Sequence, residues 1–410
     1  MAEIKLPLNK CLFLVGLVLF YILFGIAIKV LLVTGMINPS VNTFTKEENK
    51  WELGLVEAPY RLEIAKSFVS EVMAERNGHI NLIYPINFSN SSRDTNSEAI
   101  SYYLLWNVLS YNKQTFDKEL TYIENGVIHP KKYYLMWRLN SNDTATLDGE
   151  NIATDADLRA IKALYLAENQ WNGGKYKDMA DKLAVSLEEI AITEDLLFAP
   201  YGGFSNSAIW TTHEVWLSYA DFEAFAMLSE ERGKGWKEVY NNMKKAFIEA
   251  QLQNGLYNSK LDEERKYSNS LDNGAYSINS LWMMVRAAES GDEELRASAQ
   301  KSLDFYKSSF ETDGVLHNSY DASGNAVDTS DSPWVYALVG RAAIELGDRE
   351  FAEKMITKLM EFQVMNEESL YFGAFVEGSN ETPFVTQFTM QESILTFEAY
   401  NEKSKSDEGN

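Results

Sequence analysis

Apolar residues recur every three to four positions through most of the chain beyond residue 58, and this is the spacing of one face of an α-helix. Many of these segments are apolar on more than one face, as helices buried between two layers are. Loops rich in Gly, Asn and Asp separate most of them. Eleven helices are predicted in this way, over residues 59–75, 97–111, 155–171, 176–192, 211–229, 235–253, 273–290, 294–310, 332–348, 349–365 and 386–402.

Helices in two layers can close into a toroid or extend into a solenoid. A toroid of alternating inner and outer helices would account for eleven or twelve of them. Solenoids show a fixed sequence period, and none is visible here. No Pro/Gly/Ser-rich linker interrupts the helical pattern either. We therefore expect an all-α, closed (α/α)6 barrel in one domain over residues 51–402, followed by a polar tail over 403–410.

The N-terminal segment has a different character. Residues 11–28, CLFLVGLVLFYILFGIAI, carry no charge, and a second apolar stretch extends the run to residue 36. The run is long enough to span a hydrocarbon core of about 30 Å. Two lysines precede it, which favours a cytoplasmic N-terminus. A cleaved signal peptide is the alternative, but no convincing small-x-small cleavage site follows the run. The expected order is a cytoplasmic segment (1–10), a transmembrane anchor (11–36), a linker (37–50) and an extracellular domain.

Composition narrows the classes of function. The chain has 60 acidic and 37 basic residues, a net charge of −23, so it would repel nucleic acid. Its single cysteine, Cys11, excludes an internal disulfide. The four histidines are widely separated, and no HxxxH or CxxC spacing occurs, so neither a metal site nor a cofactor is expected.

Several carboxylates and one tryptophan stand where helices are predicted to begin or in short loops between them. Glu98 falls in the first turn of a predicted helix, and Trp137 lies in an extended segment. Asp155 and Asp157 stand two apart where the loop NIATDADLRAI becomes helical. Acidic residues in a first turn are also ordinary capping chemistry, because they complement the helix dipole. The residue types alone leave both interpretations open.

The segment ATDADLRAIKALYLAENQW (153–171) resembles the signature of glycoside hydrolase family 8. That signature opens with Ala, Ser or Thr, Asp, Ala or Gly, and Asp, and it closes on a Trp. The residues in register are Ala153, Thr154, Asp155, Ala156, Asp157, Ala163, Leu164, Ala167 and Trp171. The departures, at Ala160, Ile161 and Tyr165, fall on packing positions.

A second stretch, SEAISYYLLWNVLSYNKQTFD (97–117), is similar to the family's Ser-Glu-Gly region, with Ala99 in place of the usual Gly. The order Glu98, Trp137, Asp155 also matches the family's order and approximate spacing. The resemblance is specific over residues 93–171 and weaker beyond. The family fold is an (α/α)6 barrel, which agrees with the helical pattern.

The resemblance implies hydrolysis of β-1,4-linked glycans, typically with inversion. An inverting enzyme needs one protonated carboxylic acid and one carboxylate that activates water, about 6.5–9.5 Å apart. By resemblance, Glu98 is the general acid and Asp155 holds the distorted sugar in the central subsite. Asp157 or Thr154 can cap the helix, which leaves Asp155 free to face the cleft.

The water-activating base is matched less well. The family's Tyr-Asp-Ala-x-Arg stretch has its best counterpart in NSLDNGAYSIN (269–279), with Asp272 in the aspartate position. Leu271 replaces the Tyr, Asn273 replaces the Ala, and no Arg follows. Asp272 is our assignment for the base, and Glu214 and Asp221 are the alternatives.

Flat aromatic side chains are the expected sugar platforms, and Trp137, Tyr201 and Trp210 are the candidates. Some family members accompany exopolysaccharide synthesis machinery, so the expected partners are a polysaccharide substrate, the membrane and an exopolysaccharide synthase complex. The main hypothesis is a membrane-anchored, inverting hydrolase of a secreted polysaccharide. A non-catalytic glycan-binding or scaffold subunit is the alternative. An (α/α)6 polysaccharide lyase is a third option, which the negative charge disfavours.

Overall fold

The computed structural model describes residues 54–379 and 381–408. The predicted cytoplasmic segment, anchor and linker, residues 1–50, lie outside the described residues. Within the described ranges, no helix combines the length and the apolar character that crossing a membrane requires. By its internal contacts the chain divides into two compact units, residues 1–45 with 379–382 and residues 46–378 with 383–410. The description below concerns the second unit.

Twelve α-helices occur in the described residues. Short π-helical turns, η1 (Val69–Met73) and η2 (Ile123–Val127), extend α2 and α4. The helices are α2 (Gly54–Phe68), α3 (Ser97–Leu109), α4 (Lys113–Tyr122), α5 (Thr154–Trp171), α6 (Lys175–Ile190), α7 (Phe222–Arg232), α8 (Lys234–Glu249), α9 (Ile278–Glu289), α10 (Glu293–Asp313), α11 (Pro333–Leu346), α12 (Arg349–Met360) and α13 (Gln387–Glu408).

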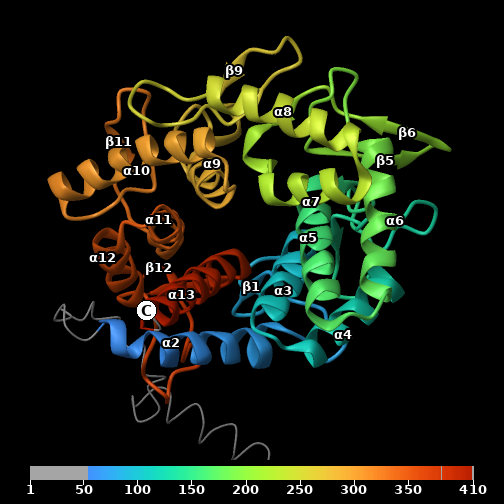
Figure 1. Cartoon of the computed structure of the whole chain (residues 1–410). Coiled ribbons are helices and arrows are strands. Elements are labelled where there is room, and N and C mark those ends of the chain that lie inside the picture. Colours follow the sequence, from blue (N-terminus) through green and yellow to red (C-terminus); the bar gives the residue numbers. More distant parts are fainter. Residues whose placement is uncertain (1–53, 380, 409–410) are drawn as a thin grey trace, which may run out of the picture. The chain divides into compact units, whose positions relative to one another are not determined.

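The helices of this unit form two concentric rings (Figure 1). Helices α3, α5, α7, α9, α11 and α13 each pack against the next in this order, and α13 returns to pack against α3. Outside them, α4, α6, α8, α10 and α12 each pack against the inner helix that precedes them in the chain, and α2 packs against α13. This is the two-layer (α/α)6 arrangement that the sequence predicts.

Burial explains the apolar pattern of the inner helices. In α3, every residue from Ala99 to Val108 is buried, since the helix is enclosed by its inner neighbours and by α4. The outer helix α6 buries one stripe, which includes Tyr176, Leu183 and Leu187. Removal of apolar surface from water at these positions is the main force that holds the two rings together.

A hydrogen bond and an ion pair join the last inner helix to its two inner neighbours, and this closes the ring. The hydroxyl group of Tyr102 on α3 donates to the carboxylate of Glu392 on α13. Glu392 is completely buried and forms an ion pair of 2.8 Å with Arg341 on α11. A buried carboxylate requires such partners, because burying an unpaired charge is very costly.

Two differences from the predicted helices have local causes. Helix α4 is absent from the prediction because it has only ten residues, and few of them are apolar. The predicted helix over 211–229 begins only at Phe222, because Asp221 is the N-cap and its carboxylate accepts from the amide of Ala224 at 3.0 Å. The residues before it form strand β7 (Val215–Trp216) and a 3-10 turn, η3 (Leu217–Tyr219).

The all-α prediction also omitted small antiparallel sheets, which order the loops that lead into the inner helices. The sheets have the strand orders β1-β13-β12, β2-β3, β4-β5-β6, β7-β8-β9 and β10-β11. Their strands are β1 (Ile83–Tyr84), β2 (Thr95–Asn96), β3 (Arg138–Leu139), β4 (Ile152–Ala153), β5 (Tyr201–Ser205), β6 (Ala208–Thr211), β7 (Val215–Trp216), β8 (Lys260–Leu261), β9 (Tyr267–Ser268), β10 (Ser319–Tyr320), β11 (Ala326–Asp328), β12 (Glu377–Ser379) and β13 (Thr382–Thr386).

Candidate active site

Two of the predicted site residues lie in the first turns of neighbouring inner helices. Glu98 is the second residue of α3, and Asp155 is the second residue of α5. The side chain of Asn96 caps α3 by accepting from the amide of Ala99 at 2.8 Å. Its amide group also donates to Glu98 Oε2 at 2.7 Å, so the cap that starts the helix also orients the carboxyl group.

Glu98 is set up to hold a proton near neutral pH. Its side chain is half-buried, and Trp137 Nε1 donates to Oε2 at 3.1 Å. Burial and the nearby charge of Asp155 raise the pKa of Glu98 to about 7, against the opposing effects of the Trp137 bond, Arg159 and Arg138. A carboxyl group with this pKa can act as a general acid.

Asp155 is buried beside Glu98 and is held by a cation. Its Oδ2 forms an ion pair of 3.0 Å with Arg159, one turn further along α5. Arg159 also donates to Ser101 Oγ at 3.0 Å and lies 3.8 Å from the centre of the Tyr102 ring. Burial raises the pKa of Asp155, and Arg159 opposes that shift. In the part of the chain that the structure describes, Asp155 Oδ1 is buried and has no hydrogen-bond partner.

Asp157 has a structural role, unlike Asp155. It is completely buried, and its Oδ1 accepts from the amide of Leu135 at 3.1 Å. The expectation that Asp157 or Thr154 caps α5 is wrong, because the N-cap is Ala153, without a side-chain bond. Thr154 Oγ1 donates instead to the carbonyl of Ala199 at 2.7 Å. Both side chains fasten neighbouring loops to the start of α5.

Asp272 ends the 3-10 turn η4 (Ser270–Asp272) that precedes α9. Its half-buried carboxylate accepts from Asn279 Nδ2 at 3.0 Å, and Asn279 Oδ1 accepts from Ser218 Oγ at 2.7 Å. Among residues 54–379 and 381–408, Asp272 Oδ2 has no hydrogen-bond partner. Burial raises the pKa of Asp272, which makes its carboxylate a better proton acceptor.

The first alternative base, Asp221, is surrounded by positive charge. It is buried and lies 3.8 Å from Lys162 Nζ and 3.4 Å from Arg286. Burial alone would raise the pKa of Asp221, but Lys162 and Arg286 hold it down to about 2. Such a carboxylate stays ionised and is a weak proton acceptor.

The second alternative, Glu214, has its oxygens occupied. Glu214 Oε1 accepts from Tyr201 at 3.1 Å and from Trp216 Nε1 at 2.9 Å, and Oε2 pairs with Lys260. Burial would raise the pKa of Glu214, but Lys260 and the two aromatic donors lower it. Among the three candidates for the base, only Asp272 has a raised pKa.

Aromatic side chains form a row that leads to the acidic pair. Ring centres are 6.2 Å apart for Trp210 and Tyr201, 5.7 Å for Tyr201 and Trp216, and 5.1 Å for Trp216 and Tyr219. Tyr201 pairs with Ala153 in the β4-β5 register, two residues before Asp155. The structure therefore brings two of the predicted platforms, Tyr201 and Trp210, together, and it puts Trp137 in contact with Glu98.

Tyr219 belongs to this site and was not predicted. Burial and the charges of Asp155 and Glu98 raise its pKa well above the usual range, and its ring centre is 5.1 Å from that of Trp216. The predicted helix over 211–229 concealed it, since Tyr219 lies in the turn before an inner helix. Glu98 was selected because it stands at the start of a predicted helix, and the same criterion could have identified Tyr219.

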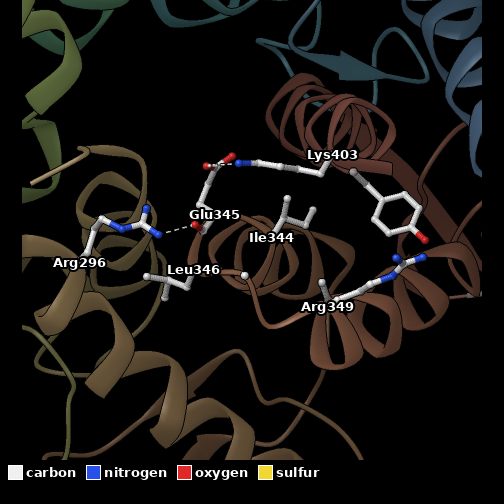
Figure 2. Close-up of a pocket in the computed structure, with 9 residues that line it drawn as sticks. Arg296, Ile344, Glu345, Leu346, Arg349 and Lys403 are labelled. Atoms are coloured by element: carbon white, nitrogen blue, oxygen red, sulfur yellow. Dashed lines mark hydrogen bonds and ion pairs between the residues drawn. The ribbon is translucent and has the colours of Figure 1, made fainter. Parts of the chain in front are cut away.

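Within the described ranges, no group of three or more His, Cys, Asp or Glu side chains is arranged to hold a metal ion. A cavity of about 330 Å³ lies away from the acidic pair, at the C-terminal end of α11 and beside α13 (Figure 2). In it, Glu345 pairs with Lys403 at 3.8 Å, and its carbonyl accepts from Arg296 at 2.7 Å. The candidate active site is thus at the N-terminal ends of the inner helices, and this cavity is separate from it.

Comparison with known proteins links the site to one family. The model of Glycosyl hydrolases family 8 matches residues 73–288, which include Glu98, Asp155 and Asp272. No curated protein matches the chain.

Solved structures share the fold. A novel alpha-amylase from Clostridium perfringens is 25% identical, with a TM-score of 0.73 over 83% of this chain and 98% of that one. PssZ from Listeria monocytogenes is 17% identical, with a TM-score of 0.61 over 81% and 94%. An endo-beta-1,4-glucanase of the same family, from an Achatina fulica gut metagenomic library, is 16% identical, with a TM-score of 0.59 over 82% and 97%.

Proposed function

The chain belongs to glycoside hydrolase family 8, and on this basis we propose that it cleaves a β-1,4-linked exopolysaccharide outside the cell, with inversion at the anomeric carbon. Membership in this family makes the protein a glycoside hydrolase. The observation that carries the mechanistic proposal is the combination of Glu98, whose pKa is raised to about 7, with Asp272, whose buried Oδ2 has no hydrogen-bond partner among the described residues.

Glu98 is the general acid in this mechanism. It transfers its proton to the glycosidic oxygen as the bond from that oxygen to the anomeric carbon breaks. Asp272 takes a proton from a water molecule, and the water oxygen attacks the anomeric carbon from the opposite face. Glu98 ends the step ionised and Asp272 ends it protonated, so exchange with solvent restores both. Inversion follows because the sugar is displaced once.

Asp155 holds the sugar at the reacting centre. Asp155 Oδ1 is available to accept from a sugar hydroxyl group, while Arg159 keeps the other oxygen in place. A fixed acceptor of this kind contributes most when its bond strengthens in the transition state. Asp155 thereby has a positioning role toward substrate, distinct from the proton transfers of Glu98 and Asp272.

The hydrolase is favoured over both alternatives from the sequence. The scaffold hypothesis rested on the imperfect motif around Asp272, and that carboxylate has the raised pKa that a base needs. A lyase of acidic glycans would use free basic side chains. The basic residues beside the site carboxylates are themselves ion-paired, Arg138 with Asp94, Arg159 with Asp155 and Lys260 with Glu214.

A second substrate class has one specific observation in its favour. The alpha-amylase from Clostridium perfringens is 25% identical to this chain over nearly its whole length, and amylases act on α-1,4-linked glucans. The proposal of a β-1,4-linked substrate rests on the family resemblance of the Glu98 and Asp155 motifs. The two are distinguished by the polymer that the enzyme cleaves.

A reducing-end assay on cellulose, xylan, chitosan and starch tests the proposal. Glu98→Gln should abolish the activity found on one of these polymers, and proton NMR of the first product should show an inverted anomer. Unchanged turnover in Glu98→Gln would remove the acid assignment. Activity on starch alone would replace the β-1,4-linked substrate by an α-linked one.

The location is proposed from the sequence. We place an anchor at residues 11–36 and the hydrolase outside the cell, next to an exopolysaccharide synthase complex. Protease added to intact cells should then degrade the hydrolase domain. Protection of the domain in intact cells, with degradation after lysis, would contradict this location.

A further inference from the structure

Glu214 joins two sheets at the edge of the candidate active site. It immediately precedes β7, where Trp216 pairs with Lys260 of β8. Tyr201 comes from β5, which belongs to a different sheet and pairs with β4. One carboxylate therefore contacts side chains from three strands in two sheets, and it does so directly beside the aromatic row.

These contacts need a side chain that only accepts hydrogen bonds and carries a negative charge, and a carboxylate meets both needs where a neutral side chain does not. Half-buried Tyr and Trp side chains need a partner for their O–H and N–H groups. An ionised carboxylate accepts from both donors and from a lysine at once, since all of its sites are acceptors. Lys260 keeps Glu214 ionised, so the two aromatic donors always meet an acceptor.

We propose that Glu214 is a positioning residue that holds Tyr201 and Trp216 in the orientation that binds pyranose rings of the substrate next to Glu98 and Asp155. The inference rests on the proposed glycan hydrolase. The row ends at Tyr219, whose ring centre is 5.1 Å from that of Trp216, and Tyr201 pairs with Ala153, two residues before Asp155. Pocket walls with aromatic faces and a few fixed polar groups are typical of ligand sites.

Glu214→Gln tests this role, because a glutamine has the same shape but only one acceptor oxygen. The kinetics should be measured on cellohexaose, xylohexaose, chitosan hexamer and maltohexaose and on the corresponding trimers. We expect KM for the best hexamer to rise about tenfold while kcat changes less than about threefold, because ground-state and transition-state binding are weakened equally. Tyr201→Phe, which removes a single hydroxyl bond, should raise KM by about threefold.

The chain offers a matched control in the outer ring. Glu188 on the outer helix α6 accepts from Trp236 Nε1 at 2.8 Å and pairs with Arg232, so it copies the indole and cation contacts of Glu214 with residues outside the aromatic row. Glu188→Gln should leave KM and kcat unchanged. Equal changes in KM for Glu188→Gln and Glu214→Gln would overturn the positioning role. An unchanged KM in Glu214→Gln would also overturn it, provided that this variant unfolds at the wild-type temperature. A loss of kcat without a change in KM would make Glu214 a candidate for the base and would also overturn it.

Binding measurements separate this inference from the proposed hydrolysis. If the wild-type protein turns over none of the four hexamers, the proposed hydrolysis fails on these probes, and calorimetry then measures their binding. Hexamer binding that Glu214→Gln weakens and Glu188→Gln does not would still support the platform. Absence of binding by all four hexamers, or equal binding by both variants, would overturn it.

Discussion

Asp221 and Asp272 occupy comparable places, each shortly before an inner helix, α7 or α9, and those two helices pack against each other. The surroundings of the two carboxylates differ. Asp221 is enclosed by Lys162 and Arg286, and its pKa is lowered to about 2. Asp272 contacts the neutral amide of Asn279, and its pKa is raised. The neighbouring charges, more than the position on the helix, decide which carboxylate can accept a proton and which one stabilises the fold.

The largest expected effect tests the catalytic side of this comparison. Asp272→Asn should lower kcat by about 10³–10⁴-fold, because the neutral amide cannot take a proton from water. The thermal unfolding midpoint should stay close to wild type, since Asn279 can still donate to the new side chain. Steady-state kinetics on the active polymer measure the first effect. A loss of kcat below about tenfold would show that another residue activates water.

Asp221→Asn tests the structural side. Asparagine retains an N-cap oxygen for Ala224, so the substitution removes mainly the charge. Lys162 keeps Glu223 and Arg286 keeps Glu289 as ion-pair partners, so the loss of the Asp221 charge should cost about 2–3 kcal/mol in the free energy of unfolding. Denaturant titration measures this cost. Wild-type stability with a large loss of kcat would reverse the assignments of the two aspartates.

The stability that the Asp221 ion pairs contribute should decrease as the pH is lowered. The pKa of Asp221 is about 2 in the folded chain and about 3.9 in an unfolded one. The ion pairs therefore contribute their full stability above pH 4, and this contribution of about 2–3 kcal/mol is lost as the pH falls through 2. The difference in unfolding free energy between wild type and Asp221→Asn should accordingly shrink below pH 4. A difference that stays constant down to pH 2 would contradict the lowered pKa.

The smallest effect is a shift in the pH profile. The general acid must be protonated, so kcat/KM should fall as the pH rises through about 7, the pKa of Glu98. The Trp137 bond lowers that pKa, so Trp137→Phe should move the alkaline limb to higher pH. Asp272 must be ionised, so the acid limb should belong to it and should vanish in Asp272→Asn. An alkaline limb that is unmoved in Trp137→Phe would show that another group controls it.

The sequence predicted the features that depend on local spacing. The helical periodicity indicated eleven of the twelve helices in the described residues, and the motifs around Glu98 and Asp155 indicated one end of the inner ring. Contacts between distant segments were not predictable. Asp157 binds the amide of Leu135, and the cations around Asp221 come from α5 and α9. A carboxylate in a sequence carries no information about which cation will fold against it.

The site residues were predicted unevenly for the same reason. Glu98 and Asp155 lie inside long motifs, whereas Asp272 has one weak match, and only its raised pKa separates it from Glu214 and Asp221. Tyr219 was missed because its turn interrupts a stretch with helical periodicity. The assignment of these residues to steps of the reaction stays a prediction until the variants are measured.

The contact between the first and last inner helices has a consequence for biosynthesis. Helix α3, which carries Glu98, is enclosed only when α13 packs against it and Glu392 meets Tyr102. Ribosomes make α13 after the other helices of the barrel, so the growing polypeptide lacks a wall of the barrel until residues 387–408 emerge. Contacts between such distant segments form late and slowly in folding. The nascent enzyme is therefore expected to stay inactive until α13 has been made, and premature termination before α13 should yield a product for proteolysis instead of a partly active hydrolase.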